Sequence, residues 1–263
     1  MSRKAKRAAV NAKPAKKLIK KVYCVIGYPI KHSLSPKLHN AAFRKLKIPA
    51  RYEAVEVKPR DLAKFMRDYR ARYAGGNVTI PHKQTIMKYL DRVSPEAKKI
   101  GAVNTIVNRE GKLIGYNTDV FGAMFSLQKI GRVALRNKKV MVLGAGGAAR
   151  AVVHGLKKAG ASVTILNRTL AHAKKLASDF RCAYAALKDF QKCTSRGLDI
   201  LINTTSVGMW PNMDIIYRPR ITQLLRDAKA AGCKIITGDH MFLAQAAKSF
   251  ELWTGARPKF PKL

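Results

Sequence analysis

The chain has 263 residues, of which 47% are hydrophobic, so it can bury a substantial core in one large domain or two smaller ones. Its 52 Lys and Arg residues against 15 Asp and Glu give a formal net charge of +37, and such a surface attracts polyanions at low salt. No apolar run approaches the roughly eighteen residues of a membrane-spanning helix, so we predict no membrane partner.

The cysteines are far apart in the sequence and include no C-x-x-C pair. This spacing indicates neither a zinc site nor a disulfide framework. We therefore predict no bound metal, reduced thiols and a cytoplasmic location. The four cysteines are Cys24, Cys182, Cys193 and Cys233.

Residues 1–21 contain no acidic residue and little that could pack in a core. We interpret them as a disordered basic tail. A transit peptide would be similarly basic but usually richer in Ser and Arg. The remaining basic residues are spread along the whole chain, which favours a generally basic surface over a dedicated nucleic-acid site.

A strand is predicted over residues 21–26 (KVYCVI), followed by a loop and then a helix. Ser35 suits the N-cap of that helix and Pro36 its first position. The hydroxyls of Ser33 and Ser35 beside a helix N-terminus could hold a carboxylate, although the segment alone favours a simple capping serine. Apolar residues then recur at four-residue spacing, as on one buried face: Leu38, Ala42 and Leu46.

The next stretch combines short strands with polar residues at their ends. Residues 77–83 (NVTIPHK) predict a short strand broken by Pro81, and residues 101–116 predict a hairpin that turns at 108–111. Asp119 comes directly after this hairpin in a chain with few acids. An isolated aspartate in such a place is more often a helix cap than a catalytic group.

Residues 139–169 predict a strand, a glycine-rich turn, a helix and a second strand. The turn at 144–149 fits G-x-G-x-x-A, the dinucleotide-binding pattern, in the setting that gives that pattern meaning. Gly144 permits the tight turn, Gly146 lets the backbone approach a pyrophosphate, and Ala149 allows close helix packing. The alternative is a glycine-rich turn in an α/β fold without a ligand.

The end of the second strand indicates which dinucleotide binds. NAD sites usually place Asp or Glu there, to bind the ribose 2′-hydroxyl. This strand ends in Asn167, Arg168 and Thr169, with no acid to repel a 2′-phosphate. Arg168 could supply a planar cationic fork to the phosphate. The sequence therefore predicts NADP.

Eight motifs follow one another in the order typical of one family: SLSP (33–36), NVTIPHK (77–83), GAVNT (101–105), GYNTD (115–119), GAGGAAR (144–150), NRT (167–169), NTTSVGM (203–209) and MFLAQAAKSFELWTG (241–255). On these motifs the chain resembles the shikimate dehydrogenase family over about residues 22 to 255.

The resemblance implies an α/β fold with an N-terminal mixed α/β substrate domain and a Rossmann-type NADP-binding domain, and an active site between them. We expect the substrate domain at residues 22–120, completed by the last helix within 239–263. The cofactor domain is expected at 121–238. The implied reaction is the NADPH-dependent reduction of 3-dehydroshikimate to shikimate, on the route to chorismate and aromatic amino acids.

The resemblance also assigns roles to residues. Lys83 would protonate the oxygen that gains charge as hydride arrives, and Asp119 would orient Lys83. The residues implied to bind substrate are Ser33, Ser35, Thr79, Lys83, Asn104, Asp119, Tyr217 and Gln245. The residues implied to bind NADP are Gly144, Ala145, Gly146, Gly147, Ala148, Ala149, Arg150, Asn167, Arg168, Thr169, Met209 and Gly238.

The chain departs from the family in its excess of positive charge and in the stretch after the NTTSVGM motif. Only residues 210–213 separate that motif from 214–217, whereas a parallel crossover needs about a dozen residues. We therefore expect a shortened late crossover, which leaves the position of Tyr217 open. The pair Asp239 and His240, where the family usually has small or apolar residues, is interpreted as a polar pair in a loop.

Three interpretations of function remain. The first is an active NADP-dependent shikimate dehydrogenase, a monomer or homodimer. The second is a catalytically weak homologue whose basic surface mainly binds polyanions. The third is a quinate/shikimate dehydrogenase, which usually accepts NAD. The complete polar set around Lys83 and Asp119 favours the first.

Overall fold

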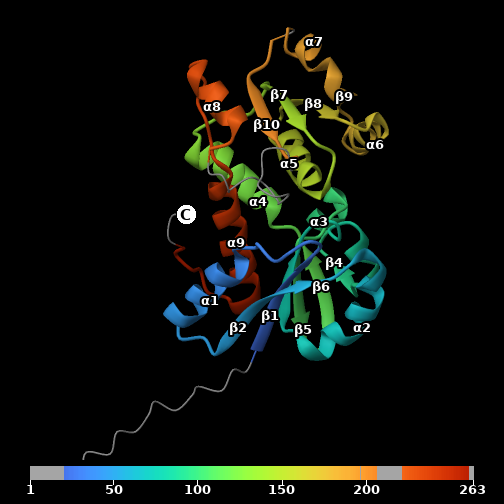
Figure 1. Cartoon of the computed structure of the whole chain (residues 1–263), viewed down its shortest axis with the longest axis vertical. Helices are drawn as coiled ribbons and strands as arrows, with labels where there is room; N and C mark the ends of the chain where they lie inside the picture. The colour runs from blue at the N-terminus through green and yellow to red at the C-terminus, as the bar shows by residue number, and fades with distance from the viewer. Residues whose placement is uncertain (1–20, 196, 206–220, 261–263) are drawn as a thin grey trace, which may run out of the picture.

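The computed structural model of the chain contains two β-sheets, one above the other in Figure 1. It describes residues 21–195, 197–205 and 221–260. The first sheet has six strands in the order β2-β1-β3-β5-β6-β4, and the second has four in the order β10-β7-β8-β9. The predicted α/β class is confirmed.

The first sheet is mixed: β1 pairs in parallel with β2 and β3, and β5 is antiparallel to β3 and β6. Its strands are β1 (Lys21–Gly27), β2 (Ala50–Glu56), β3 (Gly75–Val78), β4 (Arg92–Val93), β5 (Thr105–Arg109) and β6 (Lys112–Tyr116). The helices packed around it are α1 (Ser35–Lys45), α2 (Leu62–Arg72), α3 (Pro95–Ile100) and α9 (Gly238–Thr254), with 3-10 turns at Pro59–Asp61 and Thr85–Tyr89.

Strand β1 is buried on both faces because helices cover the first sheet on both sides (Figure 1). Its alternate side chains enter different cores, as the two-residue period of a strand requires. Tyr23 and Val25 pack in the cluster that contains residues of α1 and α9. Cys24 and Ile26 pack in the cluster that contains residues of α2.

The second sheet is wholly parallel and has the strand order of a Rossmann fold. Strands β7 and β10 are neighbours although β8 and β9 lie between them in sequence, and folds of this type bind their ligands at the carboxyl ends of such a pair. The elements are β7 (Lys139–Leu143), α5 (Gly147–Lys158), β8 (Ser162–Asn167), α6 (Leu170–Phe180), β9 (Ala183–Ala186), a 3-10 turn (Leu187–Asp189), α7 (Phe190–Thr194) and β10 (Ile200–Asn203).

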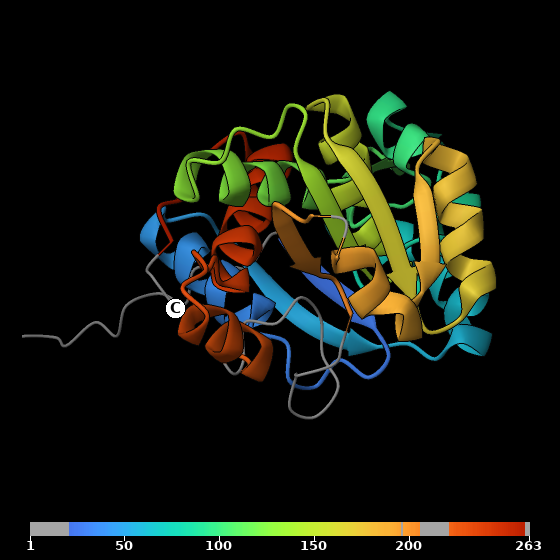
Figure 2. The same cartoon turned by 90° about the horizontal axis from the view of Figure 1, so that it is seen from above.

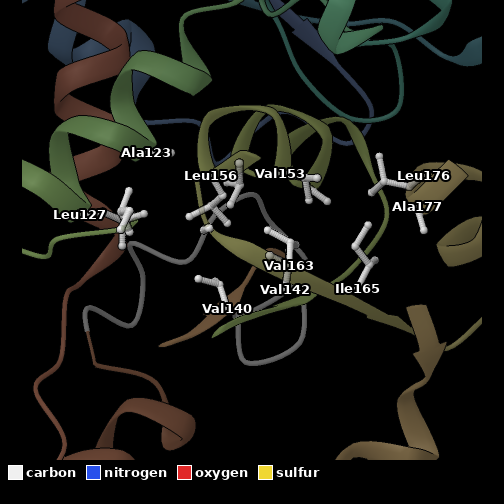
Figure 3. Packing of buried hydrophobic residues seen from close by; sticks show 14 of the residues in the cluster. Ala123, Leu127, Val140, Val142, Val153, Leu156, Val163, Ile165, Leu176 and Ala177 are labelled. Carbon is white, nitrogen blue, oxygen red and sulfur yellow. The ribbon is translucent and has the colours of Figure 1, made fainter. Parts of the chain in front are cut away.

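Aliphatic side chains from β7, β8 and α5 form the core of the second domain (Figure 3). Val140 and Val142 of β7 lie against the face of α5 that carries Val153 and Leu156, and all four side chains are almost fully buried. This contact confirms the predicted strand–turn–helix–strand unit.

Three further segments connect the two sheets: α4 (Asp119–Met124), its π-helical continuation Phe125–Ile130, and α8 (Gln223–Ala230). Helix α4 lies beside α9 on the β10 side of the second sheet, as Figure 2 shows. Helix α9 then returns to the first sheet, where the indole N–H of Trp253 donates to the Ile106 carbonyl at 2.9 Å. No helix in the described parts of the chain is both long and apolar enough for a membrane span.

Two details of α1 differ from prediction. The helix begins at Ser35 itself, and the hydroxyl of Ser33 accepts a hydrogen bond from the Ser35 N–H at 3.3 Å, so Ser35 is not the N-cap. Proline is compatible with any position of a first turn, so Pro36 does not fix the helix start to the residue. Leu46 is 39% exposed because α1 ends at Lys45 and its periodicity ends there too.

Three further predictions concern the strand before Pro81, the hairpin that follows it, and the pair Asp239 and His240. Strand β3 ends at Val78, before Pro81, and the hairpin of β5 and β6 is present. Asp239 and His240 lie in the first turn of α9 and not in a loop, and Asp239 accepts a hydrogen bond from the hydroxyl of Thr237. Thr237, in the extended conformation, is the N-cap, so the helix begins at Gly238 and includes the pair.

Two predictions fall partly or wholly beyond the described residues. The shortened crossover at 209–214 lies outside them, as do residues 1–20 of the predicted tail. Lys21, the last residue assigned to that tail, is the first residue of β1.

His39 on α1 predicts an acid-sensitive stability. It is fully buried, neither ring nitrogen has a hydrogen-bond partner among the described residues, and burial lowers its pKa to about 3. The unfolded chain takes up a proton there below pH ~6.5 while the folded chain stays neutral, so folding stability falls by about 1.4 kcal/mol per pH unit as the pH drops from 6.5 toward 3. The rings around it belong to Tyr52, Phe250, Trp253 and Phe260.

Urea unfolding at several pH values between 7 and 4 measures this slope. His39→Leu should flatten it, because the proton uptake of the unfolded state is lost. His32→Leu, which changes an exposed histidine, serves as the control and should keep the wild-type slope. Equal slopes for the wild type and His39→Leu would contradict the assignment.

Candidate active site

A pocket opens where β1 and β3 end and where α1, α4 and α9 meet. It gathers every predicted substrate-binding residue that the structure describes, and these come from five separate parts of the sequence. They are Ser33, Ser35, Thr79, Lys83, Asn104, Asp119 and Gln245. Tyr217 lies outside the described residues.

Lys83 and Asp119 form a buried ion pair in the pocket. The Lys83 ammonium lies 3.1 Å from one Asp119 oxygen, and the two residues are only 7% and 4% exposed. The other Asp119 oxygen accepts a hydrogen bond from the Asn104 amide at 2.8 Å. The carboxylate is thus held on both sides, which fixes its direction toward the lysine.

The segment that carries Lys83 is anchored on both sides of the residue. The ring of His82 is buried, and its Nε2 lies 2.6 Å from the carbonyl oxygen of Val57. The carbonyl of Lys83 itself accepts the N–H of Val103 at 2.7 Å. The backbone therefore presents the lysine at a defined place, in a segment that is not a regular strand.

Asn104 is oriented by its neighbours as well as orienting Asp119. Its side-chain carbonyl oxygen accepts hydrogen bonds from the N–H of Thr118 at 2.7 Å and from the hydroxyl of Thr105 at 2.9 Å. Its amide also lies 3.4 Å from the Gln245 carbonyl oxygen, and the Gln245 amide donates to the Phe242 carbonyl. An asparagine with this many fixed partners has one stable orientation.

Sequence reasoning missed a layer of buried polar groups beneath the pocket. The Ser249 hydroxyl, fully buried on α9, lies 2.8 Å from the Thr105 hydroxyl and 3.0 Å from that of Thr118, and it accepts from the Asn77 amide at 3.1 Å. The side-chain carbonyl oxygen of Asn77 accepts a hydrogen bond from the hydroxyl of Tyr52 at 2.7 Å. Asn77, Thr118 and Ser249 all lie inside the motifs named above, but neither the motifs nor their spacing indicates that these side chains bond one another.

Thr79 carries the polar atom in the pocket that is most suited to a ligand. Its hydroxyl oxygen is buried and makes no hydrogen bond with any residue that the structure describes. A buried hydroxyl without a partner costs free energy, so a hydroxyl-bearing ligand in the pocket would stabilise this arrangement.

The glycine-rich turn has the shape of a pyrophosphate site. Gly144 has φ +107°, and a Cβ there would lie 2.6 Å from the hydroxyl oxygen of Thr204, so only glycine fits. A Cβ on Gly146 would meet no atom within 4 Å, so the backbone is open to a ligand. A Cβ on Gly147 would lie 2.9 Å from the Cβ of Lys83, so this turn directly adjoins the substrate pocket.

The carboxyl end of β8 is exposed and carries no acid. Arg168 makes no hydrogen bond or ion pair with any part of the chain that the structure describes. The Asn167 amide donates to the Thr169 carbonyl at 3.0 Å, which holds the turn into α6. A free guanidinium here suits an anionic group on the ribose.

Three predicted cofactor residues remain to be placed. Arg150 follows the glycine-rich turn, but its guanidinium bonds the Ile100 carbonyl and pairs with Asp179. Gly238 is the first residue of α9. Met209 lies outside the described residues.

Family models match almost the whole described chain. The model described as shikimate dehydrogenase substrate binding domain matches residues 25–106, that for shikimate / quinate 5-dehydrogenase matches 126–230, and that for the shikimate 5′-dehydrogenase C-terminal domain matches 240–262. The chain belongs to the shikimate dehydrogenase family. The predicted family and its two kinds of domain are thereby confirmed, while the exact boundaries at 22, 121 and 239 stay predictions.

Individual members of the shikimate dehydrogenase family are similar over nearly their full length. Shikimate dehydrogenase (NADP(+)) of Bacillus cytotoxicus is 43% identical, in an alignment that covers 93% of this chain and 96% of the relative. The Thermus thermophilus enzyme in complex with NADP(H) and shikimate is 38% identical with a TM-score of 0.82, covering 91% and 95%. The Listeria monocytogenes enzyme in complex with shikimate and NAD is 35% identical with a TM-score of 0.81, covering 90% and 93%.

Proposed function

We propose that this protein catalyses the reversible, NADPH-dependent reduction of 3-dehydroshikimate to shikimate, the step expected on the way to chorismate and aromatic amino acids. The observation that carries the proposal is the buried pair of Lys83 and Asp119, in a pocket that adjoins a dinucleotide-binding turn through Gly147. The names of the similar family members support the same substrate and NADP.

The pocket supplies what the reduction of a ketone requires. Bound NADPH supplies a hydride to the carbonyl carbon, and the carbonyl oxygen gains negative charge. The Lys83 ammonium stabilises this charge and donates a proton to the oxygen. Asp119 holds the ammonium in place, and Asn104 holds Asp119, so the donor needs little reorganisation during the reaction.

The other pocket residues fit the remaining groups of the substrate. Ser33 and Ser35 lie at the N-terminus of α1, whose free N–H groups and dipole favour the substrate carboxylate. Thr79 and Gln245 bind ring hydroxyls, and Thr79 has the hydrogen-bonding capacity to do so. Tyr217 keeps its assignment to the substrate as part of this proposal.

The cofactor is held by the second domain. The backbone of residues 144–149 and the N-terminus of α5 would hold the pyrophosphate, and Arg168 would bind the 2′-phosphate of NADP. Asn167 and Thr169 support this end of the cofactor. Met209 and Gly238 are assigned to the nicotinamide end of the cofactor in this proposal.

A steady-state assay tests the proposal. Purified protein is given 3-dehydroshikimate with NADPH, and shikimate with NADP, beside NAD and quinate as alternative cofactor and substrate. We expect turnover with shikimate and NADP and much lower kcat/KM with NAD or quinate. Efficient use of NAD and quinate would favour the quinate/shikimate alternative, and absence of turnover would favour a catalytically weak homologue.

The basic surface supports a second, non-enzymatic property. With 52 Lys and Arg against 15 acids, most basic residues have no acid to pair with. We propose non-specific polyanion binding beside catalysis. The predictions of a cytoplasmic location and of a monomer or homodimer are retained with this proposal.

Binding to DNA or RNA should be independent of sequence and should fall steeply with added salt, because it rests on counterion release. Removing residues 1–20 should weaken this binding without changing NADPH-dependent turnover, since no motif lies there. Fluorescence anisotropy with two unrelated oligonucleotides over a salt series measures both effects. A salt-resistant, sequence-selective complex that blocks turnover would reverse the order of the two functions.

A further inference from the structure

Arg150 lies in the first turn of α5, next to the glycine-rich turn, and its side chain reaches two other helices. Its Nε donates to the carbonyl of Ile100, the last residue of α3, and its Nη1 lies 2.7 Å from an oxygen of Asp179 on α6. The guanidinium also lies over the ring of Phe180, 5.4 Å from its centroid. Only 11% of the side chain is exposed.

The C-terminus of α3 provides a carbonyl and space for this guanidinium. Gly101 follows Ile100 with φ +70°, the left-handed conformation that ends many helices, and it thereby exposes the Ile100 carbonyl. A Cβ at this position would lie 2.6 Å from Nη2 of Arg150. Glycine therefore favours the backbone conformation and leaves the space that the arginine occupies.

The same turn of α5 touches the catalytic lysine. The backbone of Gly147 packs on the side chain of Lys83, with 2.9 Å between the Cβ of Lys83 and the position of a Cβ at 147. Helix α3 belongs to the first domain and α5 to the second, and Figure 1 shows them adjacent where the domains meet. Arg150 thus joins the cofactor-binding helix to the domain that carries Lys83.

We infer that Arg150 is a positioning residue, which fixes the N-terminus of α5 at a set distance from Lys83 through its contacts with Ile100 and Asp179. The inference rests on the proposed function. Hydride transfer needs the two reacting carbons within about 3–3.5 Å, and a displacement of about 1 Å can lower the rate on the order of 100-fold. Arg150 acts on this geometry, whereas a direct cofactor contact would act on affinity.

Three variants test this role. Arg150→Met keeps the apolar stem and removes every donor, and Arg150→Lys can reach one of the two partners but not both. Asp179→Asn leaves Arg150 and its bond to Ile100 intact and removes only the ion pair. The control is Lys158→Met, since Lys158 also pairs across this interface, with Glu96 of α3 at 3.8 Å, but is 75% exposed.

Arg150→Met should lower kcat for 3-dehydroshikimate reduction on the order of 10- to 100-fold, leave the Kd for NADPH within about twofold of the wild type, and raise the deuterium isotope effect with NADPH labelled at the transferred hydrogen. The Kd is measured by NADPH fluorescence. Arg150→Lys should recover part of the loss, Asp179→Asn should show a smaller loss in the same direction, and Lys158→Met should match the wild type.

Two results would overturn the inference. A weaker Kd for NADPH with unchanged kcat would make Arg150 a cofactor contact, and a lower melting temperature with unchanged kinetics would make it only structural. Amide hydrogen exchange gives a readout that does not need turnover: Arg150→Met should speed exchange in both α3 and the start of α5. If the wild type itself is inactive, the proposed function fails, and unchanged exchange then also rejects the contact.

Discussion

Replacing Lys83 with alanine is expected to lower kcat by at least about 100-fold while the KM for 3-dehydroshikimate changes much less. The ammonium meets an oxygen that becomes charged only as hydride arrives, so its contribution belongs to the transition state. Stopped-flow or steady-state absorbance of NADPH at saturating substrate gives kcat. Lys88→Ala, which removes a lysine five residues away and outside the pocket, should keep the wild-type value.

The folded state must be checked in the same experiment. Without Lys83 the carboxylate of Asp119 remains buried beside Asn104 and loses its cationic partner, which destabilises the fold. Circular dichroism below the melting temperature shows whether the variant is folded when it is assayed. A folded Lys83→Ala protein that kept most of its kcat would remove Lys83 from the mechanism.

Replacing Arg168 with alanine should raise the KM for NADP about 10- to 100-fold and leave the poor use of NAD nearly unchanged. Only NADP carries the 2′-phosphate, and loss of a charge-assisted contact costs about 1.5–3 kcal/mol. Kinetic titrations with both cofactors at saturating shikimate measure the difference. The exposed position of Arg168 at the end of β8 is the structural basis for this expectation.

A matched variant separates the effect of the Arg168 contact from the general attraction between a basic protein and an anionic cofactor. Lys174→Ala removes one exposed positive charge from α6 but not from the end of β8, and it should change the KM for NADP little. If Arg168→Ala weakened NADP and NAD in parallel, Arg168 would be structural, and the choice of NADP would rest on Asn167 alone.

Local signals in the sequence were sufficient for the first part of the second domain. The strand–turn–helix–strand unit at 139–169 is marked by glycine, by apolar runs and by the start of a helix, and the structure reproduces each part. Element ends were less accurate. Ser35 begins its helix instead of preceding it, and Asp239 lies inside α9. Neither helix start has a side-chain cap hydrogen bond to mark it, and helix ends inferred without one are uncertain by one or two residues.

The predicted substrate residues that the structure describes do meet in one pocket, but the groups that hold them could not be inferred from spacing. Ser249 contacts Asn77 although 172 residues separate them, and only the return of α9 to the first sheet brings them together. Arg150 shows the same limit. Its place in a cofactor motif suggested a ligand contact, while its side chain bonds residues of two other helices.

The claim that Lys83 and Asp119 act as one unit can be tested most directly by a double-mutant cycle in kcat/KM for NADPH, measured at saturating 3-dehydroshikimate. Lys83→Ala, Asp119→Asn and the double variant are compared with the wild type. A second cycle, made from Lys83→Ala and Arg168→Ala, is the control for two independent sites. We expect the double variant at 83 and 119 to be no slower than Lys83→Ala alone, because Asp119 acts on kcat/KM through the lysine. Losses that multiply for 83 and 119, as they should for 83 and 168, would contradict the account.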